Sequence, residues 1–115
     1  LGLSVALIDR RSFPRDKLCG GGLTGRCVAA AERLLGHPLP DSLAERRGSF
    51  EFRAHGAPLG RVEGVPPIHL TTRREFDAYL QRSAIAAGAE DWSGRKPSAI
   101  DPARGRVTLE DGETL

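Results

Sequence analysis

The sequence has little that would support a metal site, a membrane span or a nucleic-acid interface. It contains only two cysteines, outside any CxxC pattern, and three scattered histidines, so no zinc-ligand spacing is present. No apolar run approaches the roughly 20 residues that a membrane-spanning helix needs. The 17 Lys and Arg residues nearly balance the 15 Asp and Glu residues, which argues against nucleic acid as a partner. What remains is an apolar fraction of 39%, which is enough for the core of one ordinary domain.

The first informative segment is an apolar run that ends at a carboxylate. Residues Leu3 to Ile8 lack polar alternation, which is typical of a strand covered on both faces. Asp9 follows at the carboxyl end of this predicted strand, where a carboxylate is well placed to bind a ribose hydroxyl in a nucleotide-binding sheet. On the residues alone, a capping or solvent-facing role for Asp9 stands as an equal alternative.

A basic loop follows the predicted strand. We expect Arg10 and Lys17 to contact adenosine or phosphate, because cations beside a ribose-binding carboxylate suit the anionic centre of a dinucleotide. Arg11 and Arg15 are expected to lie in a solvated part of the same loop.

The loop ends in the run Cys19-Gly20-Gly21-Gly22. Three successive glycines remove every β-carbon from this stretch, so a flat ligand could approach the main chain closely. We expect the glycine amides to meet the polar edge of a ring near a helix N-terminus; a flexible hinge is the alternative. A redox role for Cys19 is disfavoured, because neither a nearby histidine nor a resolving cysteine at CxxC spacing is present.

The rest of the chain is predicted to alternate helices and strands. Arg73 begins the second predicted helix, and a cation at that end opposes the helix dipole, which suggests that Arg73 reaches for an anion; an ordinary surface charge is the equal alternative. The predicted elements are a helix capped by Thr24 and ended after Leu35 by Gly36, strands at Ser49–Arg53, Leu59–Val62 and Ile68–Thr71, a turn at Gly64–Pro67, a helix at Arg73–Ala87, strands at Ala89–Ser93 and Ala99–Ile100, and a terminal hairpin around Asp111-Gly112.

Two motifs resemble those of the geranylgeranyl reductase family, flavoproteins of the p-hydroxybenzoate hydroxylase-like group. The first is DRRSFPRDKLCGGGL at residues 9–23, and the second is TRREFDAYL at residues 72–80. The resemblance implies FAD as the cofactor. It implies that Asp9 binds the adenosine ribose, that Arg10 and Lys17 lie near adenosine or pyrophosphate, and that Arg73 contacts the cofactor. The Cys19–Gly22 loop would lie by the isoalloxazine ring. Pro97 departs from the family pattern at the adenine position.

The expected fold is α/β: a partial FAD/NAD(P)-binding Rossmann-like domain that lacks its first strand and GxGxxG turn and carries an inserted β-rich segment. We expect a truncated chain that cannot hold FAD tightly alone. Residues 1–48 would supply the cofactor-binding strand, loop and helix. Residues 49–72 would belong to a substrate-side sheet, and residues 73–115 would return to the cofactor domain.

The predicted function is that of a fragment of an FAD-dependent oxidoreductase, a geranylgeranyl reductase-like enzyme that reduces isoprenoid double bonds, with NAD(P)H as a candidate electron donor. A flavin-dependent monooxygenase or halogenase, and a non-catalytic nucleotide-binding module, are the alternatives. A small molecule or an isoprenoid lipid is the expected partner. Neither a catalytic residue nor a metal ligand is identified. A cytoplasmic location is expected, with membrane association and oligomeric state left open.

Overall fold

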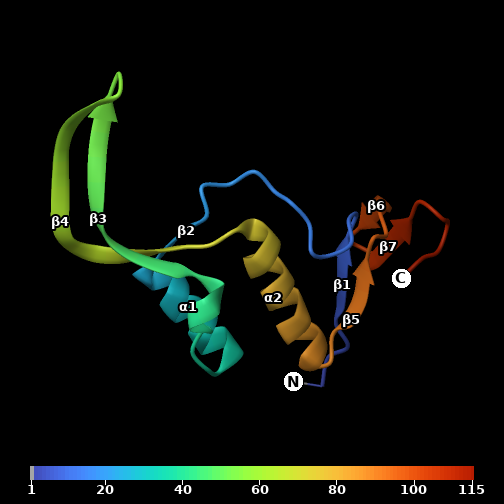
Figure 1. Cartoon of the computed structure of the whole chain (residues 1–115). Helices are drawn as coiled ribbons and strands as arrows, with labels where there is room; N and C mark the ends of the chain where they lie inside the picture. Colours follow the sequence, from blue (N-terminus) through green and yellow to red (C-terminus); the bar gives the residue numbers. More distant parts are fainter. Residues whose placement is uncertain (1) are drawn as a thin grey trace. The chain divides into compact units, whose positions relative to one another are not determined.

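The computed structural model describes residues 2–115, so Leu1, the first residue of the predicted cofactor-binding segment, lies outside the described residues. The chain divides into two compact units. One comprises the residues up to Lys17 together with Arg73–Leu115, and the other comprises Leu18–Thr72. The secondary structure is mixed α/β, with one parallel strand pair and two antiparallel sheets (Figure 1).

The first unit is built on a parallel strand pair. Strand β1 (Ala6–Asp9) pairs with β5 (Glu90–Ser93), and Asp9 lies opposite Ser93. Helix α2 (Arg73–Ala86) comes directly before β5. It carries the chain back along the strand pair, so that β5 can run parallel to β1. Strand β1 begins later than predicted, and Leu3 is 77% exposed, so the first part of the apolar run is not covered in this structure.

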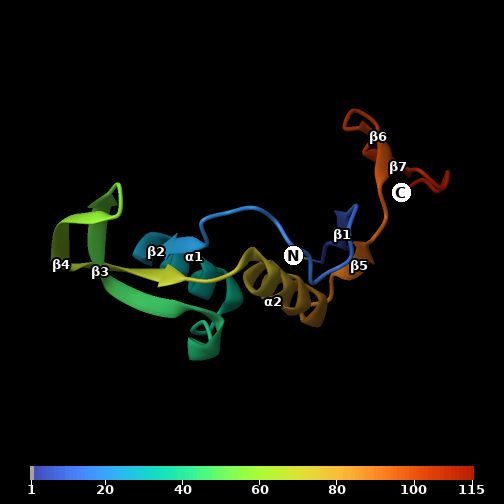
Figure 2. The same ribbon diagram turned by 45° about the horizontal axis from the view of Figure 1, so that its top comes forward.

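A small antiparallel hairpin completes the first unit. Strand β6 (Pro97–Asp101) pairs with β7 (Arg106–Leu109), and Figure 2 shows both strands clearly. The chain then turns at Gly112, whose φ of 87° suits glycine, and Thr114 bridges back to Thr108. The predicted terminal hairpin is therefore confirmed, and Leu109, which is 1% exposed, is its buried residue.

Helix α1 (Gly25–Leu35) of the second unit follows its sequence signals closely. Thr24 is the N-cap, and its hydroxyl accepts a hydrogen bond from the Cys27 backbone N–H. Gly36 ends the helix at a left-handed φ of 77°, where its N–H donates to the Glu32 carbonyl. Ala31 is buried, whereas Leu34 is 88% exposed in this structure.

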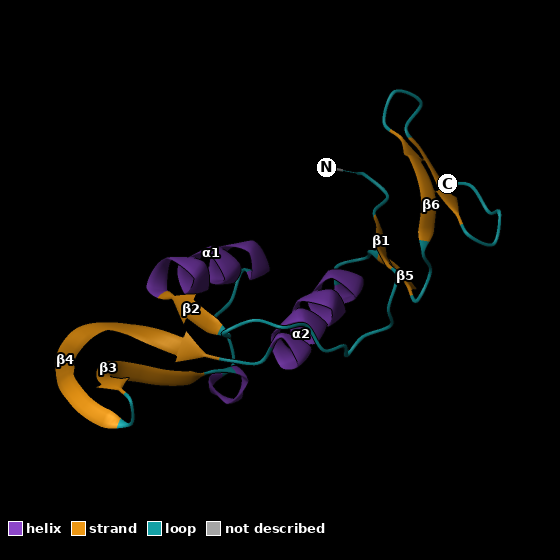
Figure 3. Ribbon diagram, turned by 90° about the horizontal axis from the view of Figure 1, so that it is seen from above, coloured by secondary structure: helices purple, strands orange, loops and turns teal. Residues whose placement is uncertain are grey.

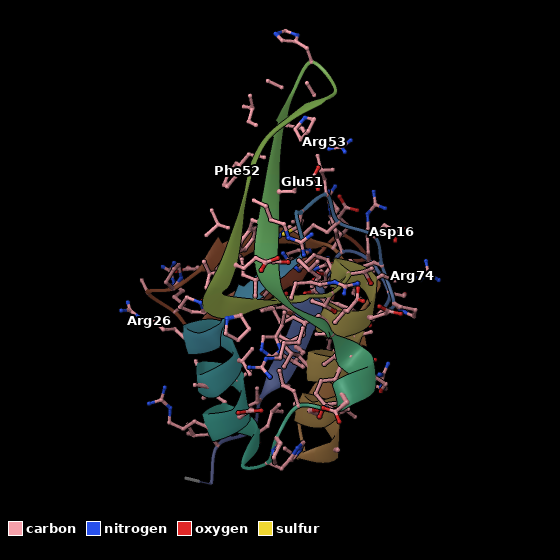
Figure 4. All side chains as sticks on the ribbon, turned by 60° about the vertical axis from the view of Figure 1, so that its left-hand side comes forward. Asp16, Arg26, Glu51, Phe52, Arg53 and Arg74 are labelled. Atoms are coloured by element: carbon pink, nitrogen blue, oxygen red, sulfur yellow. The ribbon has the colours of Figure 1, made fainter. Side chains whose placement is uncertain are left out.

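The remainder of the second unit is a three-stranded antiparallel sheet in the order β2-β4-β3 (Figure 3). Strands β3 (Glu45–Ala54) and β4 (Ala57–Leu70) form a long hairpin. Strand β2 (Gly22–Thr24) pairs with the other edge of β4. A short 3₁₀ helix, Asp41–Leu43, precedes β3. In Figure 4, Phe52 lies on the side of β3 opposite Glu51 and Arg53, as alternation in a strand requires.

This sheet differs from the prediction in two ways. Strand β2 was not predicted, and the expected turn at Gly64–Pro67 is instead part of the single strand β4. The pairing passes from Arg47 opposite Ile68 to Ser49 opposite Glu63, so Gly64–Pro67 have no cross-strand partner in the register. Prolines cannot donate to a strand ladder, and an irregularity of this kind lets the strand continue past them.

Candidate cofactor-binding site

Asp9, the last residue of β1, holds its carboxylate in a local turn. The Arg11 backbone N–H donates to Asp9 Oδ1 over 2.9 Å, and the Arg95 N–H donates to the Asp9 main-chain carbonyl over 3.2 Å. The first hydrogen bond closes an Asx-type turn, which forms because the short aspartate side chain can reach the amide two residues ahead. The carboxylate is thus fixed at the carboxyl end of the strand, where the sequence predicted it.

Arg15 bridges two carboxylates, and this contact was missed. Its Nε donates to Asp9 Oδ2 over 3.0 Å, and one terminal nitrogen lies 3.2 Å from Asp77 Oδ2 on α2. The side chain is only 17% exposed, and its guanidinium lies 4.8 Å from the centre of the Phe13 ring. The expected solvated position of Arg15 was therefore wrong. Asp77 is 62 residues away in sequence, so local patterning could not reveal the contact.

Arg73 shares Asp77 with Arg15. Its Nε and one terminal nitrogen donate to the two oxygens of Asp77 over 2.6 and 2.7 Å, a forked pair one helical turn apart. Arg74 differs: its side chain is 57% exposed, and its guanidinium lies 3.7 Å from the carboxylate of Asp16, with both residues labelled in Figure 4. Of the two arginines at the start of α2, Arg73 is the one connected to the Asp77–Arg15–Asp9 cluster.

The charges around Asp9 favour its ionised form. Desolvation raises the pKa of Asp9, but the Arg11 N–H, the Arg15 hydrogen bond and the positive charges of Arg15 and Arg10 together outweigh it. The pKa of Asp9 therefore lies below its ordinary value, and the group is a carboxylate acceptor at neutral pH.

Two hollows of the first unit meet at Asp9 and Arg15. The larger, of about 390 Å³, lies among β1, β5 and α2, with Leu7, Leu80 and Ala84 among its apolar residues. The smaller, of about 310 Å³, is lined by the loop after β1 and is rich in cations. Its lining residues are Asp9, Arg10, Arg11, Arg15, Asp16 and Lys17, so the predicted residues Arg10 and Lys17 border the same hollow as Asp9.

The glycine run belongs to the second unit, and its members differ. Gly21 has a φ of 67°, and a β-carbon there would lie 2.0 Å from the Thr71 carbonyl oxygen. Thr71 N also donates to the Gly21 carbonyl over 2.9 Å, so this glycine is required by its own unit. Gly22 begins β2. A β-carbon at Gly20 would meet nothing within 4 Å, which leaves its backbone open to a ligand.

The predicted residues thus fall into two clusters, one in each unit. Asp9, Arg10, Lys17 and Arg73 lie in the first unit, whereas the Cys19–Gly22 loop lies in the second. Cys19 is exposed, and its Sγ accepts a weak hydrogen bond from Gly21 N over 3.5 Å.

Cys27 is an exposed thiol beside the N-cap of α1. The Thr24 hydroxyl donates to its Sγ over 3.3 Å and lowers the pKa of this exposed thiol. Its place in the first turn of α1, three residues after an N-cap threonine, is the sequence signal that could have found it.

Two kinds of site are absent from residues 2–115. No cluster of His, Cys, Asp and Glu side chains could hold a metal ion there. Nor does any helix in this range have the length and apolar character needed to cross a bilayer.

No family model matches this chain, and the known proteins that are similar to it include the following three. A menaquinone reductase of Mycobacterium tuberculosis is 50% identical over 121 residues, covering 96% of this chain and 29% of its own length. A menaquinone reductase of Mycolicibacterium smegmatis is 32% identical, with 99% and 30% covered. An uncharacterised protein of Methanosarcina barkeri is 27% identical over 99 residues, with 85% and 24% covered.

These names correct one prediction. The chain spans about 30% of the length of the menaquinone reductases that it resembles. The predicted geranylgeranyl reductase identity is wrong, because the relatives that carry a functional name are menaquinone reductases and not geranylgeranyl reductases.

Proposed function

We propose that this chain is the part of an FAD-dependent oxidoreductase that binds the adenosine half of the cofactor, and that the complete protein reduces a lipid quinone of the menaquinone class. The observation that carries the proposal is the ionised Asp9 at the end of β1, beside a hollow lined by Arg10 and Lys17. The names of the similar proteins support reduction over the monooxygenase and halogenase alternatives. The Rossmann-like domain is part of the same proposal.

The residues around Asp9 fit the adenosine half of FAD. An ionised carboxylate offers about four acceptor positions. Arg11 N uses one position on Oδ1, and Arg15 is directed at Oδ2, so Oδ1 can still accept a ribose hydroxyl. Arg10 and Lys17 supply positive charge for the phosphates in the adjoining hollow.

We assign the glycine loop, Cys19–Gly22, to the flavin ring of the same cofactor. The open backbone at Gly20 suits close approach of a flat ring, with Cys19, Gly21 and Gly22 as its neighbours in the loop. FAD, when bound, would supply the electron transfer, with NAD(P)H as the proposed donor. The chain's own residues would bind and orient the cofactor: Asp9 the ribose, Arg10 and Lys17 the phosphates, and Arg73 an anionic part near α2. The lipid quinone would be the small-molecule partner.

The proposal is tested by the flavin content of the complete protein and its activity on menaquinone. We expect a yellow protein whose FAD is released by Asp9→Ala, because the ribose loses its charged acceptor. Gly20→Val should also release flavin, since its side chain would occupy the space that the ring needs. Arg74→Ala is the matched control, because Arg74 is exposed and only distantly paired with Asp16, and this variant should keep its flavin.

Two outcomes would contradict the proposal. A colourless complete protein that does not take up added FAD would exclude the cofactor. A protein that binds FAD but does not pass electrons to menaquinone would exclude the substrate class and leave the cofactor site standing.

A further inference from the structure

Arg15 occupies a position that the proposed cofactor site does not yet explain. Its guanidinium contacts Asp9 and Asp77. Arg15 also borders both hollows of the first unit, the larger one among β1, β5 and α2 (the apolar hollow) and the smaller one lined by the loop after β1 (the basic hollow). Only 17% of the side chain is exposed. An arginine intended for a phosphate would present its donors to the hollow, whereas at least three nitrogen–oxygen contacts of Arg15 are made within the protein.

The contact with Asp9 is directional. Arg15 Nε and a terminal nitrogen lie 3.0 and 2.9 Å from the same oxygen, Asp9 Oδ2, while Arg11 N holds Oδ1. Because the two oxygens are held by different donors, the carboxylate plane cannot rotate without breaking one of these contacts. The remaining acceptor position on Oδ1 then points in a defined direction.

The other end of Arg15 is anchored on α2. Asp77 is 11% exposed and is held by the forked contact with Arg73, so it is a fixed point for the guanidinium. The ring of Phe13, 4.8 Å away, lies against the same group. A loop arginine restrained on several sides can hold its partner more firmly than a solvated one.

We propose that Arg15 is a positioning residue that orients the Asp9 carboxylate for a cofactor ribose by tying it to Asp77 on α2. The inference rests on the proposed function, because it gives Asp9 the role of ribose acceptor. It adds a residue that does not itself touch the cofactor.

The electrostatic surroundings of Asp9 support this role. The charged groups near it are Arg10, Arg11 and Arg15 of the loop, Arg73 and Asp77 of α2, and Asp91 of β5, with Asp16 and Lys17 on the basic hollow. Among the side chains, Arg15 is the one that lowers the pKa of Asp9 both by a hydrogen bond and by its charge. Removing it should therefore let Asp9 take up a proton at higher pH.

The test compares Arg15→Gln, Arg15→Lys and Arg11→Gln in the complete protein, with FAD as the probe. FAD affinity and release are measured between pH 3 and 7, over the range in which circular dichroism shows each variant folded. For Arg15→Gln we expect FAD affinity at pH 7 to fall by about 10- to 100-fold, a loss of the size that follows removal of an outer partner of a ligand-binding group, because Asp9 is no longer held in one orientation. Its pH midpoint of FAD release should also move upward. Arg15→Lys keeps the charge but not the fork, so its midpoint should move less.

Arg11→Gln is the matched control. It removes the same charge from the same hollow, but it keeps the backbone N–H that binds Asp9. We therefore expect its pH midpoint to match that of the unmodified protein, even if its FAD affinity falls.

The outcomes separate the two proposals. If the unmodified protein binds no FAD, the proposed function fails. If it binds FAD and Arg15→Gln keeps the same affinity and pH midpoint, or only lowers the melting temperature, Arg15 is a structural brace and the inference fails.

Discussion

At the residue scale, adjacent glycines of one motif have different physical roles. The run Gly20-Gly21-Gly22 was predicted as one ligand-facing loop, but Gly21 packs against the Thr71 backbone, whereas Gly20 borders open space. The sequence shows three residues without β-carbons; it cannot show which backbone neighbour each one meets. A loss of flavin on changing Gly21 would therefore not identify a flavin contact, because the change would disturb the fold first.

This difference gives a prediction for stability. Gly21→Ala should lower the free energy of unfolding by at least about 2 kcal/mol, because alanine is strained at a φ of 67° and its methyl would displace the Thr71 carbonyl. Gly20→Ala should stay within about 0.5 kcal/mol of the unmodified protein. Denaturant unfolding of both variants measures this. Equal losses would contradict the close approach of Gly21 to Thr71.

A second prediction concerns the pH dependence of stability at Asp9. Its pKa is lowered in the folded state, so the ionised group stabilises the fold above the unfolded value of about 3.9, and this contribution is lost as pH falls through the folded pKa. Asp9→Asn should therefore be less stable at pH 7, by about 1 kcal/mol or less because the group is partly exposed, and the difference should narrow as the pH falls below about 4.

Thermal melts at several pH values measure this difference. Asp16→Asn is the control, because Asp16 is 85% exposed and its contact with Arg74 is long, so little change is expected at either pH. A gap for Asp9→Asn that stays constant from pH 7 to pH 3 would contradict the lowered pKa.

At the element scale, the helices could be predicted and the sheets only partly. Helix α1 begins and ends where Thr24 and Gly36 indicate, and α2 ends one residue earlier than predicted, before the left-handed Gly88. These signals are local. Strand β2 was missed because it depends on pairing with β4, a partner that is distant in sequence. Gly64–Pro67 have the composition of a turn, but they lie inside strand β4.

The cap of α1 yields a prediction that joins stability to thiol chemistry. Thr24→Ala should cost about 1 kcal/mol, because the Cys27 N–H loses its acceptor. It should also raise the pKa of the Cys27 thiol and slow its alkylation near pH 8, since the Thr24 hydroxyl no longer donates to the sulfur. Thr24→Ser, which keeps the hydroxyl, should preserve both properties. Alkylation of Thr24→Ala at an unchanged rate would contradict the assigned hydrogen bond.

At the scale of the whole molecule, the sequence predicted which residues would be polar and ionised but not which would meet. Asp9 was identified because it follows a strand, and Arg10 and Lys17 because they follow Asp9. Arg15 was missed because its partner on α2 is separated from it by the entire second unit, Leu18–Thr72. Long-range contacts of this kind follow from the parallel pairing of β1 and β5, which brings the loop after β1 and helix α2 into the same unit.

The most direct test of the central claim is the structure of the complete protein with FAD bound. We expect a ribose hydroxyl within hydrogen-bond distance of Asp9 Oδ1, with Arg15 still joining Asp9 to Asp77, and the isoalloxazine ring against the backbone of Gly20. FAD bound elsewhere, with Asp9 contacted only by Arg11 and Arg15, would contradict it.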